Sequence, residues 1–128
     1  MKNKQTKNRP KNLNLLTIRL PINAVVSILH RMSGVVLFLL IPPLLWSFQL
    51  SVTDVQSYDW LASLNQHVLV KLVLITCAWP FFHHFYAGIR HLAQDVHWMT
   101  SLQKAQLSSR LVLCLDTITV AIFAWQIW

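Results

Sequence analysis

Three long stretches of the chain are almost continuously apolar, and polar residues gather between them. The first stretch runs from about residue 25 to residue 50, the second from about 68 to 91, and the third from about 108 to 128. A helix needs about 20 predominantly apolar residues to cross a bilayer. The pattern therefore predicts an all-α membrane protein with three transmembrane helices, preceded by a polar arm over residues 1–24.

The first stretch contains 19 residues without a formal charge, Met32 to Leu50. A secretory signal peptide is the competing interpretation. The polar region before it is too long for one, however, and no small-residue cleavage site follows. We therefore expect a retained helix, kinked or locally broken at Pro42-Pro43, and a second kink at Pro80.

The composition agrees with a membrane protein and excludes several soluble classes. Apolar residues make up 55% of the chain and charged residues 12%, whereas about 25% is typical of soluble domains. A large soluble catalytic domain, a multidomain enzyme and a disordered tail protein are excluded. Cys77 and Cys114 lie in apolar stretches without CxxC spacing, which predicts small buried side chains rather than a disulfide or a metal site.

The charges predict an orientation. Eleven Lys and Arg against four Asp give a net charge of +7, but nucleic-acid binding requires a soluble basic face, and this chain offers only a short basic arm. No Lys or Arg lies between Met32 and Val70, where only Asp54 and Asp59 are charged. Positive loops remain on the cytoplasmic side. This places the amino terminus and the second loop, with Arg90, Lys104 and Arg110, in the cytoplasm, and the Asp-bearing loop and the carboxyl end outside.

Ionisable residues crowd one level of the predicted bundle. His30 and Arg31 lie near the cytoplasmic end of the first helix, and the second helix returns to the same side with four more groups: His83, His84, Arg90 and His91. Such groups are costly at membrane depth, so they usually face a protein interior, a cavity or a ligand.

The spacing around His84 is that of one helix face. His84, Gly88 and His91 are four and three residues apart, so they lie on the same side of the second helix. The chain has only two glycines, Gly34 and Gly88. Glycine in a membrane helix permits close approach, either of a second helix or of a flat cofactor, and the spacing leaves both open.

A membrane histidine with a glycine one turn later fits an axial ligand of haem, since a neutral imidazole nitrogen binds the iron. His30, Arg31, Arg90 or His91 could then hold the propionates by charge-assisted hydrogen bonds. A polar network between helices is the alternative. By depth alone, His30 could also be a second axial ligand.

Two segments carry a family resemblance. Residues 27–34 read SILHRMSG, with Arg9-Pro10 and Leu13 upstream, and they resemble the signature S-I-x-H-R-x-[ST]-G. The second signature, H-x-x-x-G-x-R-H-L-x-x-D, is similar to the series His84, Gly88, Arg90, His91, Leu92 and Asp95. Both are typical of the cytochrome b556 membrane-anchor subunits of succinate dehydrogenase (complex II), and the resemblance covers nearly the whole chain as a single anchor domain.

The resemblance implies an assembly in the bacterial inner membrane. Members of this family anchor a flavoprotein subunit and an iron–sulfur subunit together with a second small anchor subunit. They share one haem b with that second anchor and form part of a site where ubiquinone is reduced. This chain alone is not expected to oxidise succinate, because it lacks a flavin-binding fold and a cysteine set for iron–sulfur clusters.

The resemblance also implies roles for individual residues. It makes His84 the haem iron ligand, with the second ligand a histidine of the other anchor. His30 and His91 come close to the haem propionates, while it is the spacing that adds Arg31 to them and Gly88 to the haem site. Ser27 and Arg31 contact ubiquinone, and Asp95 lies near the quinone entrance. Without the resemblance, Ser27 is an ordinary helix hydroxyl bonded to its own backbone.

Other interpretations remain. A fumarate reductase anchor runs similar chemistry in reverse, and a small structural membrane protein would carry no haem. A di-iron enzyme of the desaturase kind requires H-x-x-H-H clusters, and position 80 is a proline. We expect His83 to contact another subunit and Asp116 to form a hydrogen bond across helices. We expect His67 and His97 to be solvated.

Overall fold

The computed structural model describes residues 19–128. They form α1 (Ile22–Thr53), α2 (Val55–Leu64), α3 (Val68–Asp95) and α4 (Leu102–Ile127), with no strand in this range. Three of these helices, α1, α3 and α4, are long and apolar enough to cross a membrane. The prediction of an all-helical protein with three such helices is therefore confirmed. Most of the predicted basic arm lies outside the described residues, and so do Arg9-Pro10 and Leu13.

The helices extend beyond the apolar stretches that predicted them. The largest difference is at α4, which begins at Leu102 instead of residue 108, so that Lys104 and Arg110 lie on a helix and not in a loop. Residues 103–106 read QKAQ, and all of these are good helix formers. The length of an apolar stretch therefore underestimates the length of its helix wherever the first turns of the helix are polar.

A short helix, α2, occupies the segment predicted as the Asp-bearing loop. Asp54 ends α1 and caps α2, because its Oδ1 accepts a hydrogen bond from the backbone N–H of Ser57 at 2.7 Å. An aspartate in this position satisfies an amide that the helix itself leaves free. The Ser57 amide and hydroxyl together lower the pKa of the Asp54 carboxyl below its usual value.

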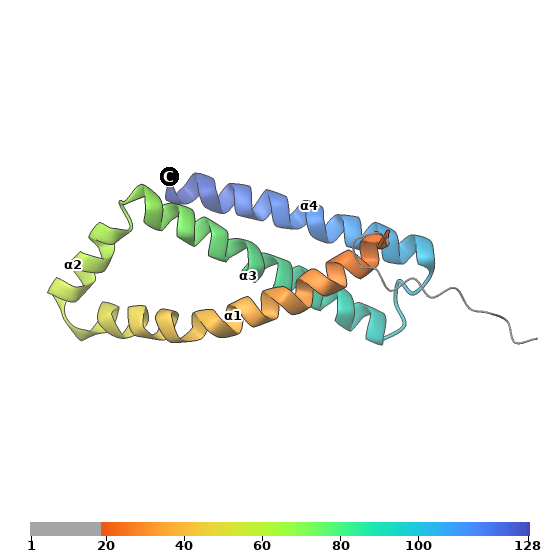
Figure 1. Ribbon diagram of the computed structural model, residues 1–128, viewed down its shortest axis with the longest axis horizontal. Coiled ribbons are helices and arrows are strands. Elements are labelled where there is room, and N and C mark those ends of the chain that lie inside the picture. The colour runs from red at the N-terminus through yellow and green to blue at the C-terminus, as the bar shows by residue number, and fades with distance from the viewer. Residues whose placement is uncertain (1–18) are drawn as a thin grey trace, which may run out of the picture.

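Neither proline site breaks its helix. Helix α1 continues through Pro42 and Pro43, and α3 through Pro80. Figure 1 shows α1 curving along its length without interruption. The prolines remove individual amide donors, and a membrane helix tolerates this because neighbouring groups and small adjustments satisfy the freed carbonyls. The expectation of a local break was wrong.

The three long helices meet near the first half of α1. Helix α4 runs beside α3, while α1 crosses α3 and then diverges from it toward the end that α2 bridges (Figure 1). Val26 of α1, Ala87 of α3 and Val112 of α4 are buried together where the helices meet, with Tyr86 and Leu113 packed against them. The small side chain of Ala87, which is fully buried, permits the close approach of the helices.

Most of the apolar surface is left uncovered by the chain itself. Only 11%, 17% and 22% of the residues in the most apolar windows of α1, α3 and α4 are buried by the rest of the protein. Cys77 is half-buried and Cys114 is exposed, so the prediction of two buried cysteines was wrong for Cys114. These outer faces are available to lipid and to other membrane proteins.

Candidate functional site

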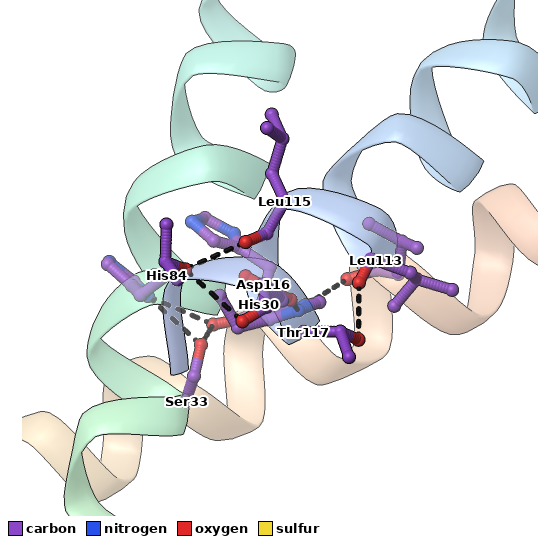
Figure 2. Close-up of polar contacts among 10 residues, drawn as sticks. His30, Ser33, His84, Leu113, Leu115, Asp116 and Thr117 are labelled. Atoms are coloured by element: carbon purple, nitrogen blue, oxygen red, sulfur yellow. Dashed lines mark hydrogen bonds and ion pairs between the residues drawn. The ribbon is translucent and has the colours of Figure 1, made fainter. Parts of the chain in front are cut away.

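The predicted cluster forms at the crossing of α1 and α3. Figure 2 shows His30 and Ser33 of α1 pointing toward His84 of α3, with Asp116 of α4 nearby. The side chain of Ser33 is buried, while those of His30 and His84 are half-buried. The structure thus brings together histidines that lie 54 positions apart in the chain.

The hydrogen bonds of His84 fix its tautomer. Its Nδ1 lies 3.1 Å from the backbone carbonyl oxygen of His30 and 3.3 Å from Oγ of Ser33. The Ser33 hydroxyl donates to the same His30 carbonyl at 2.7 Å. A carbonyl oxygen only accepts, so Nδ1 carries a hydrogen, and in the neutral ring Nε2 keeps its lone pair. Metal-binding histidines are generally held in this way, with the second ring nitrogen donating to a carbonyl or a carboxylate.

The two glycines make room for imidazole rings. A Cβ atom on Gly34 would lie 3.0 Å from Cε1 of His84, and one on Gly88 would lie 3.5 Å from Nε2 of His30. The first distance would force a shift, whereas the second is an ordinary contact. Within this chain Gly34 is therefore needed for the close approach of α1 to the His84 ring, whereas the space at Gly88 would accept a Cβ.

The histidine rings stack on one another. The rings of His30 and His84 lie 4.3 Å apart at an interplanar angle of 17°, and His91 lies 5.0 Å from His30 at 43°. Two axial ligands of one iron must direct nitrogens at each other from opposite sides of the metal. Rings that lie face to face do not do so, which argues against His30 as the second axial ligand.

Ser27 and Arg31 lie one helical turn apart on α1. The Nε of Arg31 donates to the backbone carbonyl of Ser27 at 3.4 Å, and the Arg31 side chain is exposed. Asp95, the last residue of α3, is also exposed. Arg31 follows His30 on α1, and Asp95 lies one turn beyond His91 on α3. The rings of His30 and His91 lie 5.0 Å apart. The predicted site residues therefore gather at one end of the bundle.

The sequence led us to expect that His83 contacts another subunit, and this expectation was wrong. It is fully buried within the chain, where Nδ1 lies 2.5 Å from Oδ2 of Asp116 and Nε2 lies 3.3 Å from the carbonyl of Val26. The hydrogen bond from Asp116 across helices is as predicted. The expectation for His83 failed because Asp116, 33 positions away, can be recognised as its partner only once α3 and α4 are placed together.

Arg90 is directed to α4 within this chain. The residue is 7% exposed, and its Nε donates to Oγ of Ser108 at 3.1 Å. Arg90 follows His83 and Ala87 on one face of α3, whereas His84 and His91 lie on the next face toward α1. The suggestion that Arg90 could hold a propionate stays a prediction.

The remaining histidines lie away from the cluster. His67 caps α3 and His97 lies in the turn after it, and both are exposed, as expected. Within residues 19–128, no three His, Cys, Asp or Glu side chains are arranged to hold a metal ion by themselves. This part of the chain therefore has no ligand set for a di-iron site.

Comparison with known proteins decides the family. Residues 5–123 match the family described as the succinate dehydrogenase/fumarate reductase transmembrane subunit. The chain belongs to this family. Three of its relatives carry the name succinate dehydrogenase cytochrome b556 subunit. The relative from Coxiella burnetii is 32% identical over 94% of this chain and 97% of its own length. The one from Rickettsia bellii is 34% identical over 90% of both chains, and the one from Paracoccus denitrificans is 28% identical over 91% and 92%.

Membership in a transmembrane family agrees with the three long apolar helices, and the name of the relatives agrees with the resemblance of the two signatures. Family membership also places the chain among the subunits of an oxidoreductase complex. The chain is therefore a membrane subunit of the succinate dehydrogenase type.

Proposed function

We propose that this chain is the haem b-binding anchor subunit of a succinate dehydrogenase in a bacterial inner membrane. It forms part of the site at which ubiquinone is reduced by electrons that come from the iron–sulfur subunit. The basic amino terminus faces the cytoplasm, as the positive-inside tendency predicts.

The observation that carries the proposal is the contact of His84 Nδ1 with the His30 carbonyl oxygen at 3.1 Å. It holds the hydrogen of the neutral ring on Nδ1, so Nε2 has the free lone pair. Haem iron requires such a nitrogen. A histidine in a plain helix–helix network would instead use both ring nitrogens in hydrogen bonds, as His83 does.

The surrounding residues fit the rest of the haem. His30 and His91 lie beside His84, and Arg31 is exposed at the same end of the bundle. These groups can donate hydrogen bonds to the propionates. Gly88 keeps the backbone of α3 free of a side chain at this level. The haem, shared with the second anchor subunit, supplies reversible one-electron storage when it is bound.

Ser27 and Arg31 would engage the quinone. The Ser27 hydroxyl can donate to a quinone carbonyl oxygen and pass on a proton taken from water. Arg31 keeps its positive charge at every physiological pH, so it stabilises negative charge that develops on that oxygen. Asp95 is exposed at the end of α3, where it can exchange protons with water near the quinone entrance.

The proposal predicts a defined set of partners. They are the flavoprotein subunit, the iron–sulfur subunit and a second small anchor, and the uncovered apolar faces of α1, α3 and α4 provide surface for the last of these. The test is to tag this chain, purify it from membranes in mild detergent and identify the accompanying proteins and the haem content. A preparation that contains only this chain, with no haem, would contradict the proposal.

A further inference from the structure

Arg90 carries a buried positive charge that the chain does not neutralise. The residue is 7% exposed. Its Nε donates to Oγ of Ser108 at 3.1 Å and its Nη2 to the carbonyl of Ala105 at 3.4 Å. Both acceptors are neutral. Hydrogen bonds to neutral groups orient a guanidinium, but they leave its charge uncompensated, and such a charge is costly in a membrane protein.

No carboxylate of the chain pairs with Arg90. The sequence has four acidic residues, all Asp and all within residues 19–128. Asp54 and Asp59 belong to the α2 end of the bundle, and Asp116 pairs with His83 in the one ion pair among the described residues. The fourth, Asp95, is exposed at the end of α3. Among the described residues Arg90 therefore has no carboxylate partner, which leaves its charge available to an anion of another molecule.

A groove between α3 and α4 opens beside this charge. It has a volume of about 340 Å³, and Arg90 and Ser108 line it together with mostly apolar side chains that include Tyr86, Ala93, Trp98 and Leu111. Leu111 is 50% exposed and Trp98 62% exposed, so the groove faces the surroundings of the bundle. It therefore combines a single buried cation with an apolar channel.

The position of the groove sets it apart from the histidine cluster. Arg90 lies on the face of α3 that packs on α4, and His84 and His91 lie on the face toward α1. Arg90 also lies five residues before the end of α3, which is about 7.5 Å along the helix. The exposed Trp98 follows in the next turn, as is usual for aromatic residues at the level of lipid headgroups.

We propose that this groove binds one anionic glycerophospholipid, with its phosphate paired to the guanidinium of Arg90 and an acyl chain along the apolar lining. Basic pockets between membrane helices are known to bind acidic headgroups in this manner. A haem propionate fits less well, because the haem ligand faces α1. The carboxylate of a partner subunit would leave the apolar channel unexplained.

The test uses the full chain, purified with its accompanying subunits and stripped of loosely bound lipid by detergent exchange. The samples are then incubated with vesicles of phosphatidylglycerol or of phosphatidylcholine, and retained lipid is counted by native mass spectrometry. We expect the wild type to retain one phosphatidylglycerol and no comparable phosphatidylcholine. Arg90→Gln should lower phosphatidylglycerol retention about tenfold or more, since a charge-assisted hydrogen bond is lost. Arg110→Gln, which removes an exposed arginine of α4, should leave it unchanged.

A second variant keeps the test decisive if Arg90→Gln does not fold. Ala93→Phe fills the groove without removing the charge and should also release the lipid. The proposal is overturned if Ala93→Phe retains the lipid, if a folded Arg90→Gln retains it, or if both lipids bind equally. It is also overturned if Arg90→Gln releases a protein subunit or the haem while lipid retention stays the same.

Discussion

The imidazole of His84 is held by the backbone of the opposite helix. The His30 carbonyl receives its Nδ1–H at 3.1 Å, and Gly34 leaves space for the ring because a Cβ there would come within 3.0 Å of Cε1. Orientation of a metal-binding histidine by such a contact is as important as the ligand itself. Two glycine substitutions test this arrangement.

Gly34→Ala should displace the His84 ring and lower the haem content of the purified protein several-fold. Gly88→Ala is the comparison variant: its added methyl group would meet His30 at an ordinary 3.5 Å, so it displaces no ring of this chain, and any haem that it loses reports on the cofactor side of α3. Haem per chain, measured after extraction with pyridine, compares the two. Equal haem contents in wild type and Gly34→Ala would show that the ring position is not fixed by Gly34. Loss of haem in Gly88→Ala alone would mean that the cofactor lies directly against Gly88.

Ser27→Ala and Arg31→Ala should slow ubiquinone reduction at least tenfold while most of the haem remains. Ser27 supplies only a hydroxyl, and Arg31 is exposed at the end of the cluster, so neither is needed to hold the iron. Succinate-dependent quinone reduction and haem content are measured on the same preparations. Full turnover in both variants would reject their role at the quinone.

At the residue level, the sequence was informative where function requires a spacing within one helix. The intervals between His84, Gly88 and His91 and between Ser27 and Arg31 could be read directly, and each set lies on one face as predicted. The hydrogen-bond partners of His83 and Arg90 could not be read from the sequence, because both depend on how α4 is rotated against α3. Neither the separation in sequence nor the local composition predicts that rotation.

The contact between His83 and Asp116 holds helices together. It joins α3 to α4, and the second ring nitrogen of His83 reaches the Val26 carbonyl of α1, so one buried residue connects all three long helices. Asp116→Ala leaves His83 without its partner and should destabilise the protein by about 3–5 kcal/mol, as for other buried pairs that lose one member.

Unfolding in sodium dodecyl sulfate, followed by tryptophan fluorescence, measures this loss. Thr117→Ala is the control, since Thr117 is exposed and its hydroxyl bonds only the Leu113 carbonyl of its own helix at 2.9 Å. The double variant His83→Leu with Asp116→Leu should recover much of the stability, because an apolar pair needs no charge partner. If Asp116→Ala were as stable as Thr117→Ala, the contact would have no part in holding α4.

The cap of α2 predicts a pH dependence. Hydrogen bonds from Ser57 lower the pKa of Asp54, so the ionised carboxylate is favoured when α2 is folded. The cap is therefore fully present above the usual aspartate pKa and is lost as the pH falls through the lowered value. Hydrogen exchange of the α2 amides, corrected for the intrinsic exchange rate, should accelerate in that acidic range, and Asp59→Asn, which keeps the cap, should show the same acceleration. Asp54→Ala should exchange rapidly at every pH, and an unchanged rate would reject the cap.

The three long helices were predictable because apolar length alone decides whether a segment can cross a bilayer. Helix α2 was not, because its ten residues are too short for that criterion. Its formation depends on the single capping contact of Asp54. The sequence left open whether α1 is kinked or broken at Pro42-Pro43, and the helix continues. The destabilisation that proline causes in a helix in water overstates its effect in a membrane helix.

The part of the molecule that the structure describes, residues 19–128, is an open unit of three long helices with a small core. The tightly packed region is limited to the crossing near Val26, Ala87 and Val112, and the outer faces remain apolar. Such a unit is suited to assembly with other membrane helices, as expected for an anchor that shares a haem with a second subunit. The residues proposed to bind the haem lie at this packed end of the bundle.

The visible absorption spectrum of the purified assembly tests directly whether His84 binds haem iron. We expect a reduced-minus-oxidised difference band of a b-type haem in the wild type, absent or strongly reduced in His84→Ala. The band should be unchanged in His97→Ala, which removes an exposed histidine. A colourless wild-type preparation, or a His84→Ala spectrum equal to that of the wild type, would contradict the assignment of His84 as the iron ligand.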